Sequence, residues 1–377
     1  MLSVWEKETF YSPQDIIIIG SGFVGLWSAF YLKKRNPKLK ITIVDRGIIP
    51  TGASTRNAGF ACFGSLTELL ADEQKAGTDR MLELVEMRYK GLERIRDTFS
   101  KKEIDMEMSG GYELFTKNED NLTGDLEQQI DYLNELLREI GKKKTFKLAD
   151  KETGSLGFKN ITHLIRNNLE GYLHPGKLVT ALLYKTRMMG VQVLTAIEIK
   201  KFEKINGRIQ LETNQGIPLS ATQLLICVNG FARQLLPELD VEPARGQVLL
   251  TSPINNLPWK GTFHYQQGYY YFRNLGNRVL LGGARNLALQ QEKTFSLETT
   301  GIIQNELERF LREVILPGKK FSIEDRWSGT MGTGSEKTPI LKEISPSVFC
   351  CVRMSGMGVA LAPLLGEKTA RLMSAQA

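Results

Sequence analysis

The stretch QDIIIIGSGFVG, residues 14–25, decides the fold of this chain. Its apolar part has the composition of a strand that is buried on both faces of a parallel sheet. Gly20, Gly22 and Gly25 follow in the spacing GxGxxG, and a helical pattern continues from there to Arg35. The context predicts a strand, a glycine turn and a helix in immediate succession.

A second predicted strand, Ile41–Val44, ends at Asp45. Strand, helix and strand within about 30 residues form one βαβ unit. In such a unit the glycines permit a tight turn and let the backbone approach a pyrophosphate, which binds at the helix N-terminus near Phe23 and Val24. A carboxylate at position 45 can accept hydrogen bonds from both ribose hydroxyls. The motif therefore predicts an adenine dinucleotide, without separating FAD from NAD.

The composition limits the class of protein. With 377 residues, 42% hydrophobic and 24% charged, the chain is long enough for two globular domains. No apolar run approaches the length of a membrane span, and no signal peptide opens the chain. We therefore expect a cytoplasmic protein without an integral membrane segment.

The charge distribution argues against a nucleic-acid partner, and the cysteine spacing argues against a metal site. The net charge is +7, but the basic clusters are short and scattered, which argues against a nucleic-acid partner. The cysteines have no metal-ligand spacing, so we predict no metal site. We expect reduced, structural thiols at all four positions: Cys62, Cys227, Cys350 and Cys351.

Two further segments favour FAD over NAD. The loop GASTRNAG, residues 52–59, is rich in small residues and can lie along a bulky flat ligand, with Arg56 near phosphate or ring oxygens. The C-terminal part repeats the order strand, glycine turn and helix over residues 347–373. A second helix N-terminus aimed at the cofactor would stabilise negative charge on a reduced ring.

Together these motifs resemble those of the D-amino-acid oxidase superfamily. The resemblance rests on GSGFVG, the pair Asp45-Arg46, GASTRNAGF at 52–60, HPGKL at 174–178 and VRMSGMGVALAPLLGE at 352–367. This superfamily groups FAD-dependent amine oxidoreductases such as glycine and sarcosine oxidases, D-amino-acid dehydrogenases and γ-glutamylputrescine oxidase. The similarity covers nearly the whole chain and is weakest between residues 65 and 155.

The resemblance implies an α/β fold (α+β in its two-domain arrangement) with interleaved domains. A Rossmann-like FAD-binding domain would comprise residues 1–85, 150–238 and 325–377. A substrate domain, built on a mixed and mostly antiparallel sheet, would comprise residues 86–149 and 239–324. The implied reaction is hydride transfer from the carbon beside an amine nitrogen to flavin N5, followed by hydrolysis of the imine, with FAD as the redox group.

The resemblance also implies which residues bind the cofactor. They belong to the glycine turn, the acidic strand end, the GASTRNAG loop, an adenine contact through main chain, and two turns near the flavin. The residues are Gly20, Gly22, Phe23, Val24, Gly25, Asp45, Arg46, Ser54, Thr55, Arg56, Asn57, Ala58, Gly59, Ile199, Gly230, Gly356, Met357, Gly358 and Val359.

The substrate site departs from the family pattern. By resemblance, carboxylate-binding cations are missing after Trp327-Ser328-Gly329, at Gly356 and at Ala360, so Arg273, Arg285, Arg326 or Arg353 would have to replace them, or the substrate is a larger amine without an α-carboxylate. Gly329 also occupies the position of the flavin-linked cysteine of sarcosine oxidases, so we predict non-covalent FAD. No catalytic residue is assigned; the candidates that would line the flavin are Tyr269, Tyr271, Arg273, His264 and Met331.

Several functions stay open at this point. The leading prediction is an FAD-dependent oxidoreductase that acts on a small-molecule amine or amino acid. It covers an oxidase and a dehydrogenase that passes electrons to a carrier or quinone, and it selects neither an electron acceptor nor an oligomeric state. The alternatives are a catalytically inactive FAD-binding module and an NAD-dependent dehydrogenase.

Overall fold

The computed structural model describes residues 1–117, 124–141 and 144–375. These form two compact units, and both are discontinuous in sequence. Unit 1 comprises Met1–Thr55, Pro175–Ala244 and Met331–Ala377, and unit 2 comprises Arg56–His174 and Arg245–Thr330.

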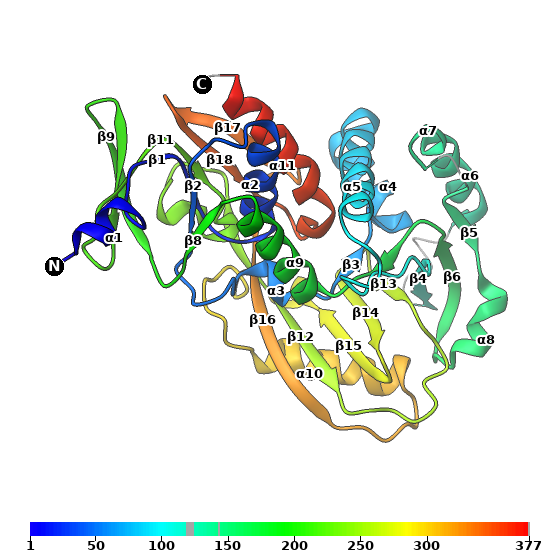
Figure 1. Ribbon diagram of the computed structural model, residues 1–377. Helices are drawn as coiled ribbons and strands as arrows, with labels where there is room; N and C mark the ends of the chain where they lie inside the picture. Colours follow the sequence, from blue (N-terminus) through cyan, green and yellow to red (C-terminus); the bar gives the residue numbers. More distant parts are fainter. Residues whose placement is uncertain (118–123, 142–143, 376–377) are drawn as a thin grey trace. The chain divides into compact units, whose positions relative to one another are not determined.

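Unit 1 is built on an eight-stranded sheet with a parallel centre (Figure 1). Strand β1 (Gln14–Ile19) lies between β2 (Ile41–Val44) and β11 (Leu219–Ile226), and all three run parallel. The parallel strands β8 and β18 extend the sheet at its two sides. The antiparallel strands β9, β10 and β17 complete the sheet. The bounds of the strands outside the central three are β8 (Gln192–Leu194), β9 (Ile199–Ile205), β10 (Arg208–Thr213), β17 (Ile340–Ser345) and β18 (Val348–Val352).

Three long helices accompany this sheet: α2 (Phe23–Arg35), α9 (Pro175–Met188) and α11 (Gly358–Ser374). Helices α2 and α11 lie side by side (Figure 1). Their backbones approach closely because a Cβ on Gly366 would lie 2.6 Å from the carbonyl carbon of Trp27. The N-terminal and C-terminal parts of the chain are therefore packed as one layer. The short helices of unit 1 are α1 (Val4–Glu8) and the 3-10 turn η3 (Asn229–Gln234), and α3 (Ala53–Arg56) lies at its boundary.

Unit 2 contains a second eight-stranded sheet, in the order β16, β12, β15, β14, β13, β4, β6, β5 (Figure 1). The pair β13 and β4 is parallel, whereas the neighbouring pairs with a known register are antiparallel. The bounds are β4 (Gly111–Thr116), β5 (Phe146–Leu148), β6 (Ile161–Asn167), β12 (Glu242–Thr251), β13 (Thr262–Tyr265), β14 (Tyr270–Leu275), β15 (Arg278–Gly283) and β16 (Ile323–Thr333).

The two faces of this sheet differ. One face carries an aromatic core in which Phe263 and Phe272 stack 4.8 Å apart, and helix α10 (Gly301–Phe310) packs against it through Phe310. The other face carries His264 and Arg273, and the two-stranded ribbon of β3 (Phe60–Ala61) and β7 (Gly171–Tyr172) contacts it. The remaining helices of unit 2 are α4 (Leu66–Ala76), α5 (Thr78–Thr98), α6 (Leu126–Leu136), α7 (Arg138–Gly141), α8 (Thr153–Leu156), the 3-10 turns η2 (Asp150–Glu152) and η4 (Arg285–Ala288), and the π-helix η5 (Leu311–Ile315).

The predicted fold class is confirmed, including the βαβ opening and the mixed sheet. The compact units have their boundaries near residues 55, 175, 244 and 331, whereas the sequence placed the domain boundaries near 85, 150, 238 and 325. Residues 56–85 belong to unit 2 because Phe63, Leu66 and Leu69 pack into one apolar cluster with α5 and α6. All four cysteines are free, which agrees with the prediction of reduced thiols, and all four are buried. Within the described residues, no helix has the length and hydropathy needed to cross a bilayer.

Candidate cofactor and substrate sites

The glycine turn of unit 1 leaves no room for side chains. Gly20 has φ +105°, and a Cβ there would lie 2.8 Å from the carbonyl oxygen of Cys227. A Cβ on Gly25 would lie 2.0 Å from the carbonyl oxygen of Gly20, well inside van der Waals contact. The turn is thus held close to both the sheet and its own helix, as the spacing predicts.

Backbone N–H groups face outward at the start of α2. The residue before the helix is Gly22, so no side chain of its own caps the first turn. The hydroxyl of Ser54 accepts the N–H of Phe23 at 2.9 Å, which brings the predicted cofactor loop to the helix N-terminus. The positive end of the helix dipole and the remaining N–H groups fit a pyrophosphate.

Asp45 is held in place by the same turn. Its Oδ2 accepts hydrogen bonds from the backbone N–H and the hydroxyl of Ser21, at 2.8 and 2.6 Å, and its Oδ1 accepts the N–H of Gly47 at 2.9 Å. Sequence reasoning missed Ser21, the middle residue of GSG, as the group that orients the carboxylate. Arg46 lies with its guanidinium 3.9 Å from the ring centroid of Phe231. Ile199 is buried at the start of β9.

A second turn of unit 1 leads into α11. Asn229, the first residue of η3, accepts the N–H of Met354 at 3.1 Å, and Gly356 follows with φ +84°. Met357 precedes the helix without a side-chain cap, as Gly22 does at α2. Because β1, β11 and β18 are parallel, the segments that follow them lie at one sheet edge. At that edge lie two helix N-termini whose N-cap residues make no side-chain cap, and they fit the phosphate and ring oxygens of an FAD molecule.

The remaining predicted cofactor and flavin-lining residues of unit 1 lie in or beside these turns. Gly230 is buried beside Asn229, and its N atom would lie 3.0 Å from a Cβ on Gly332. Met331 is half-buried, and its Sδ would lie 3.5 Å from a Cβ on Gly356. Gly358 and Val359 open helix α11, and Thr55 donates its hydroxyl to the carbonyl of Pro50.

In unit 2, the rest of the GASTRNAG loop is fixed by side-chain to backbone bonds. Arg56 donates from Nη1 to the carbonyl of Ser328 at 2.9 Å, and Trp327 donates from Nε1 to the carbonyl of Arg56 at 3.1 Å. A Cβ on Gly329 would lie 2.9 Å from the Cβ of Arg56, so this position has no room for a cysteine. Asn57 accepts the N–H of Gly59, which has φ +75°, and Ala58 is buried beside them.

The candidate substrate residues share the polar face of the unit 2 sheet. In the register of β13 and β14, His264 pairs with Tyr271 and Thr262 pairs with Arg273. The ring of Tyr271 lies over Gly282 of the next strand, where a Cβ would come within 2.5 Å of it. Burial raises the pKa of Tyr271 to about 12, although the Arg285 charge lowers it, so the phenol is neutral. Tyr269 lies immediately before β14 and is 37% exposed.

Arg273 is a buried cation without an anionic partner among the described residues. It is 4% exposed, its Nη2 donates to the carbonyl of Leu173 at 3.3 Å, and its Nε has no hydrogen-bond partner in the described chain. Its guanidinium lies 4.8 Å from the ring centroid of Tyr172. Desolvation lowers its pKa to about 10, which leaves the group charged at neutral pH.

The other three candidate arginines differ from it. Arg353 pairs with Asp240 at 2.5 Å, and Arg326 pairs with Glu308. Arg285 is half-buried, at the start of the turn after β15. Arg273 is therefore the candidate whose burial is not compensated by a carboxylate.

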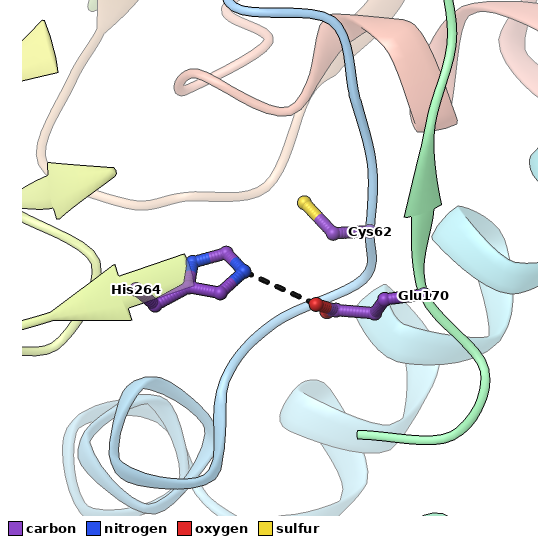
Figure 2. Close-up of side chains that lie close together, drawn as sticks. All are labelled: Cys62, Glu170 and His264. Carbon is purple, nitrogen blue, oxygen red and sulfur yellow. Dashed lines mark hydrogen bonds and ion pairs between the residues drawn. The ribbon is translucent and has the colours of Figure 1, made fainter. Parts of the chain in front are cut away.

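His264 also belongs to a buried polar cluster with Glu170 and Cys62 (Figure 2). Its Nε2 lies 3.1 Å from Oε2 of Glu170, and both side chains are buried. Desolvation lowers the pKa of His264, but the charge and hydrogen bond of Glu170, with the charge of Glu113, outweigh it and raise the pKa. Sequence reasoning missed this cluster because residues 62, 170 and 264 are far apart and form no motif. The absence of metal-ligand spacing therefore did not exclude a cluster of metal-binding side-chain types.

Family, sequence and structure comparisons all match this chain to oxidoreductases. The family model described as "FAD dependent oxidoreductase" matches residues 15–372. A curated relative, "Probable oxidoreductase OrdL" of Rhizobium meliloti (strain 1021), is 26% identical over 95% of this chain and 82% of its own length. Glycine oxidase from Geobacillus kaustophilus has a TM-score of 0.77 at 19% identity, covering 97% of this chain and 95% of its own. L-proline dehydrogenase from P. horikoshii has a TM-score of 0.76 at 19% identity, covering 97% and 94%.

Proposed function

Because the chain belongs to the family of FAD-dependent oxidoreductases, we propose that it oxidises the C–N bond of a small amine that carries a carboxylate. Bound FAD supplies the electron acceptor for this oxidation, and the resulting imine hydrolyses in water. The observation that carries the substrate class is Arg273, a buried guanidinium whose Nε has no partner in the described residues.

The carboxylate follows from the energetics of burial. A buried charge without a counter-charge costs free energy, and a paired, hydrogen-bonded one costs far less. A guanidinium fork is suited to a carboxylate because two N–H groups can donate to its two oxygens. A substrate anion at Arg273 would thus supply the partner that the described protein residues do not provide.

The neighbouring side chains favour an amine that binds in its unprotonated form. Tyr271 remains neutral and can donate its hydroxyl to the substrate. The Nε2 of His264 is hydrogen-bonded to Glu170, so His264 is not assigned as the base that removes a proton from the amine. With no base assigned on this face, the amine would enter without its extra proton, and the residues of unit 2 would position it and exclude water.

The residues predicted from the sequence to bind FAD would form the cofactor site. In unit 1, Gly20, Gly22 and Gly25 with Asp45 would hold the pyrophosphate and ribose, supported by the start of α2, where Gly22 provides no side-chain cap. The lack of space at Gly329 supports non-covalent binding. The names of the structural neighbours include an oxidase and a dehydrogenase, so oxygen and another acceptor are both retained for the test.

The test begins with an absorbance spectrum of the purified protein and of the supernatant after acid precipitation. Flavin bands that move to the supernatant are expected for non-covalent FAD. Under anaerobic conditions, amino acids and N-alkyl amino acids should then bleach the flavin, and amines of the same carbon skeleton without the carboxylate should not. Peroxide formed in proportion to substrate identifies an oxidase, and its absence identifies another acceptor. A flavin that no amine bleaches would leave only the inactive FAD-binding module.

A further inference from the structure

The cluster of Cys62, Glu170 and His264 is assembled from three separate segments of unit 2 (Figure 2). Strands β3 and β7 pair Phe60 with Tyr172 and Ala61 with Gly171. Continuing that register places residue 62 opposite residue 170. His264 reaches the same point from β13, on the polar face of the sheet.

The three side chains are ligand types that a zinc ion accepts together. One Sγ, one imidazole nitrogen and one carboxylate oxygen lie within 4.8 Å of one another, and all three residues are buried. Donors around a tetrahedral zinc ion are about 3.3 to 3.8 Å apart for bonds of about 2.0 to 2.3 Å. The sulfur would therefore have to move by at most about 1 Å toward the other two donors.

A fourth group points to the same place. The hydroxyl of Thr262 is fully buried and has no hydrogen-bond partner in the described residues. A Cβ on Gly111 would lie 2.8 Å from this hydroxyl and 2.4 Å from Oε2 of Glu170, so the glycine leaves the two oxygens facing a common space. The thiol of Cys62 likewise makes no hydrogen bond within the described chain. Unpartnered buried groups of this kind call for a ligand or an ordered water.

The charges around the cluster favour a cation. Glu113 is buried nearby and accepts bonds from Ser65 and Thr67, which hold its carboxylate in place. Glu68 lies near both Cys62 and His264, and Arg88 lies near Cys62 and 3.8 Å from a carboxylate oxygen of Glu68. A divalent ion at this cluster would neutralise the carboxylate of Glu170 and the thiolate of Cys62.

We propose that Cys62, Glu170 and His264 bind one Zn²⁺ ion, with the hydroxyl of Thr262 facing its fourth position. Binding would replace the hydrogen bond between His264 and Glu170 and release the thiol proton as the thiolate forms. Zinc has no redox chemistry, so the ion would leave the flavin reaction unchanged in kind. Its effect would be to hold the segment after β3 against β13.

The experiment measures metal directly on the FAD-loaded protein. Protein purified without chelators should contain about one zinc per chain by elemental analysis. Protein stripped of metal and titrated with Co²⁺ should gain a thiolate-to-cobalt absorption at about one equivalent. Flavin absorption is subtracted with the metal-free holoprotein, and this readout does not depend on any substrate being oxidised.

Matched variants locate the site. Cys62→Ser should remove the thiolate band, and His264→Asn or Glu170→Gln should lower zinc content at least about tenfold. Cys227→Ser is the control for a buried thiol, since Cys227 lies in unit 1 and its pKa is raised by burial and by Cys351 and Cys350. His163→Asn is the control for a histidine paired with a carboxylate, 2.8 Å from Asp150 on the surface. Both controls should keep the wild-type zinc content.

Two results would overturn the proposal. One is zinc-free wild-type protein that also takes up no Co²⁺ with a thiolate band. The other is a Cys62→Ser protein that is folded, retains FAD and still binds the metal as the wild type does. Retained FAD in each variant shows that unit 1 is folded, so failure of the metal site is distinguished from failure of the flavoprotein itself.

Discussion

The two polar regions of this molecule are built from different parts of the chain's chemistry. The glycine turn of unit 1 consists of backbone, with Gly20 and Gly25 packed so closely that a Cβ would meet a carbonyl oxygen. The polar face of the unit 2 sheet consists of side chains: Arg273 is buried without a carboxylate partner among the described residues, and His264 is paired with the buried Glu170. The glycine turn has no room for larger side chains, and the polar face of the unit 2 sheet depends on how its buried charges are paired. Substitutions should therefore fail for opposite reasons in the two regions.

The largest loss of stability and of bound FAD is expected in the glycine turn, where close packing leaves no room for a Cβ. In Gly25→Ala, the new Cβ would start 2.0 Å from the carbonyl oxygen of Gly20, so the turn and α2 would have to separate. We expect loss of bound FAD and a fall of about 4 kcal/mol or more in the free energy of unfolding. Flavin absorbance per chain and a denaturant titration measure both quantities.

Gly52→Ala is the control for this substitution, because nothing lies within 4 Å of a Cβ at that position. It should keep its FAD and its stability. Equal losses in the two variants would show that the glycine turn is not limited by packing.

Unit 2 offers a comparison of two buried arginines. Arg245 forms a bidentate pair with the buried Glu292, at 2.8 and 2.7 Å, whereas Arg273 has no carboxylate partner among the described residues. Arg245→Met should destabilise the protein by about 3 to 5 kcal/mol because it leaves Glu292 unpaired. Arg273→Met should be neutral or stabilising because it removes an uncompensated charge. Thermal and denaturant unfolding of the two variants test this, and a large destabilisation by Arg273→Met would indicate an internal partner for Arg273.

The pH dependence of carboxylate binding follows from the same residue. Desolvation lowers the pKa of Arg273 to about 10, so the cation is present below that pH and is lost above it. Affinity for a simple carboxylate such as acetate, read from the flavin spectrum, should stay level between about pH 7 and 9 and fall as pH rises past 10. A bound anion raises the pKa of Arg273, so the affinity continues to fall from about pH 10 until the pH reaches the higher pKa of the complex. An affinity that does not fall above pH 10 would exclude Arg273 as the binding cation.

The smallest effect is expected from a side chain in the region that backbone dominates. Ser54→Ala removes one acceptor from the N–H of Phe23 and should cost about 1 kcal/mol. A matching small decrease in FAD affinity is expected by titration of the apoprotein. A complete loss of FAD would mean that the start of α2 depends on side chains as much as on glycine.

The glycine turn could be predicted from the sequence because its geometry is local. The spacing from Gly20 to Asp45 carries the strand, the turn and the helix within one βαβ unit, and each element lies within about one residue of its predicted bounds. In β14 the alternation is equally local, since Tyr270 and Phe272 lie in the aromatic core and Tyr271 and Arg273 lie outside it. Only Ser21, whose role depends on the position of Asp45, was missed.

The polar face of unit 2 could be predicted only in part. Arg273, Tyr271 and His264 were recognised as candidates, but their partners depend on strand pairings across more than a hundred residues. Glu170 approaches His264 because β7 and β13 meet through the tertiary fold, and no local pattern encodes that contact. The lack of a partner for Arg273 is also a property of the folded chain.

We propose that Arg273 binds the carboxylate of the substrate. This binding is tested most directly by anaerobic flavin reduction in wild type and Arg273→Met, with a carboxylate-bearing amine and the same amine without the carboxylate. We predict that the substitution lowers the second-order rate about 10- to 100-fold for the first substrate and leaves the second unchanged, since hydrogen bonds to charged groups contribute about 1.5 to 3 kcal/mol. Arg278→Met, which removes a surface pair with Glu324 at 2.9 Å, should change neither rate. Equal losses with both substrates, or no loss with the carboxylate-bearing one, would contradict the account.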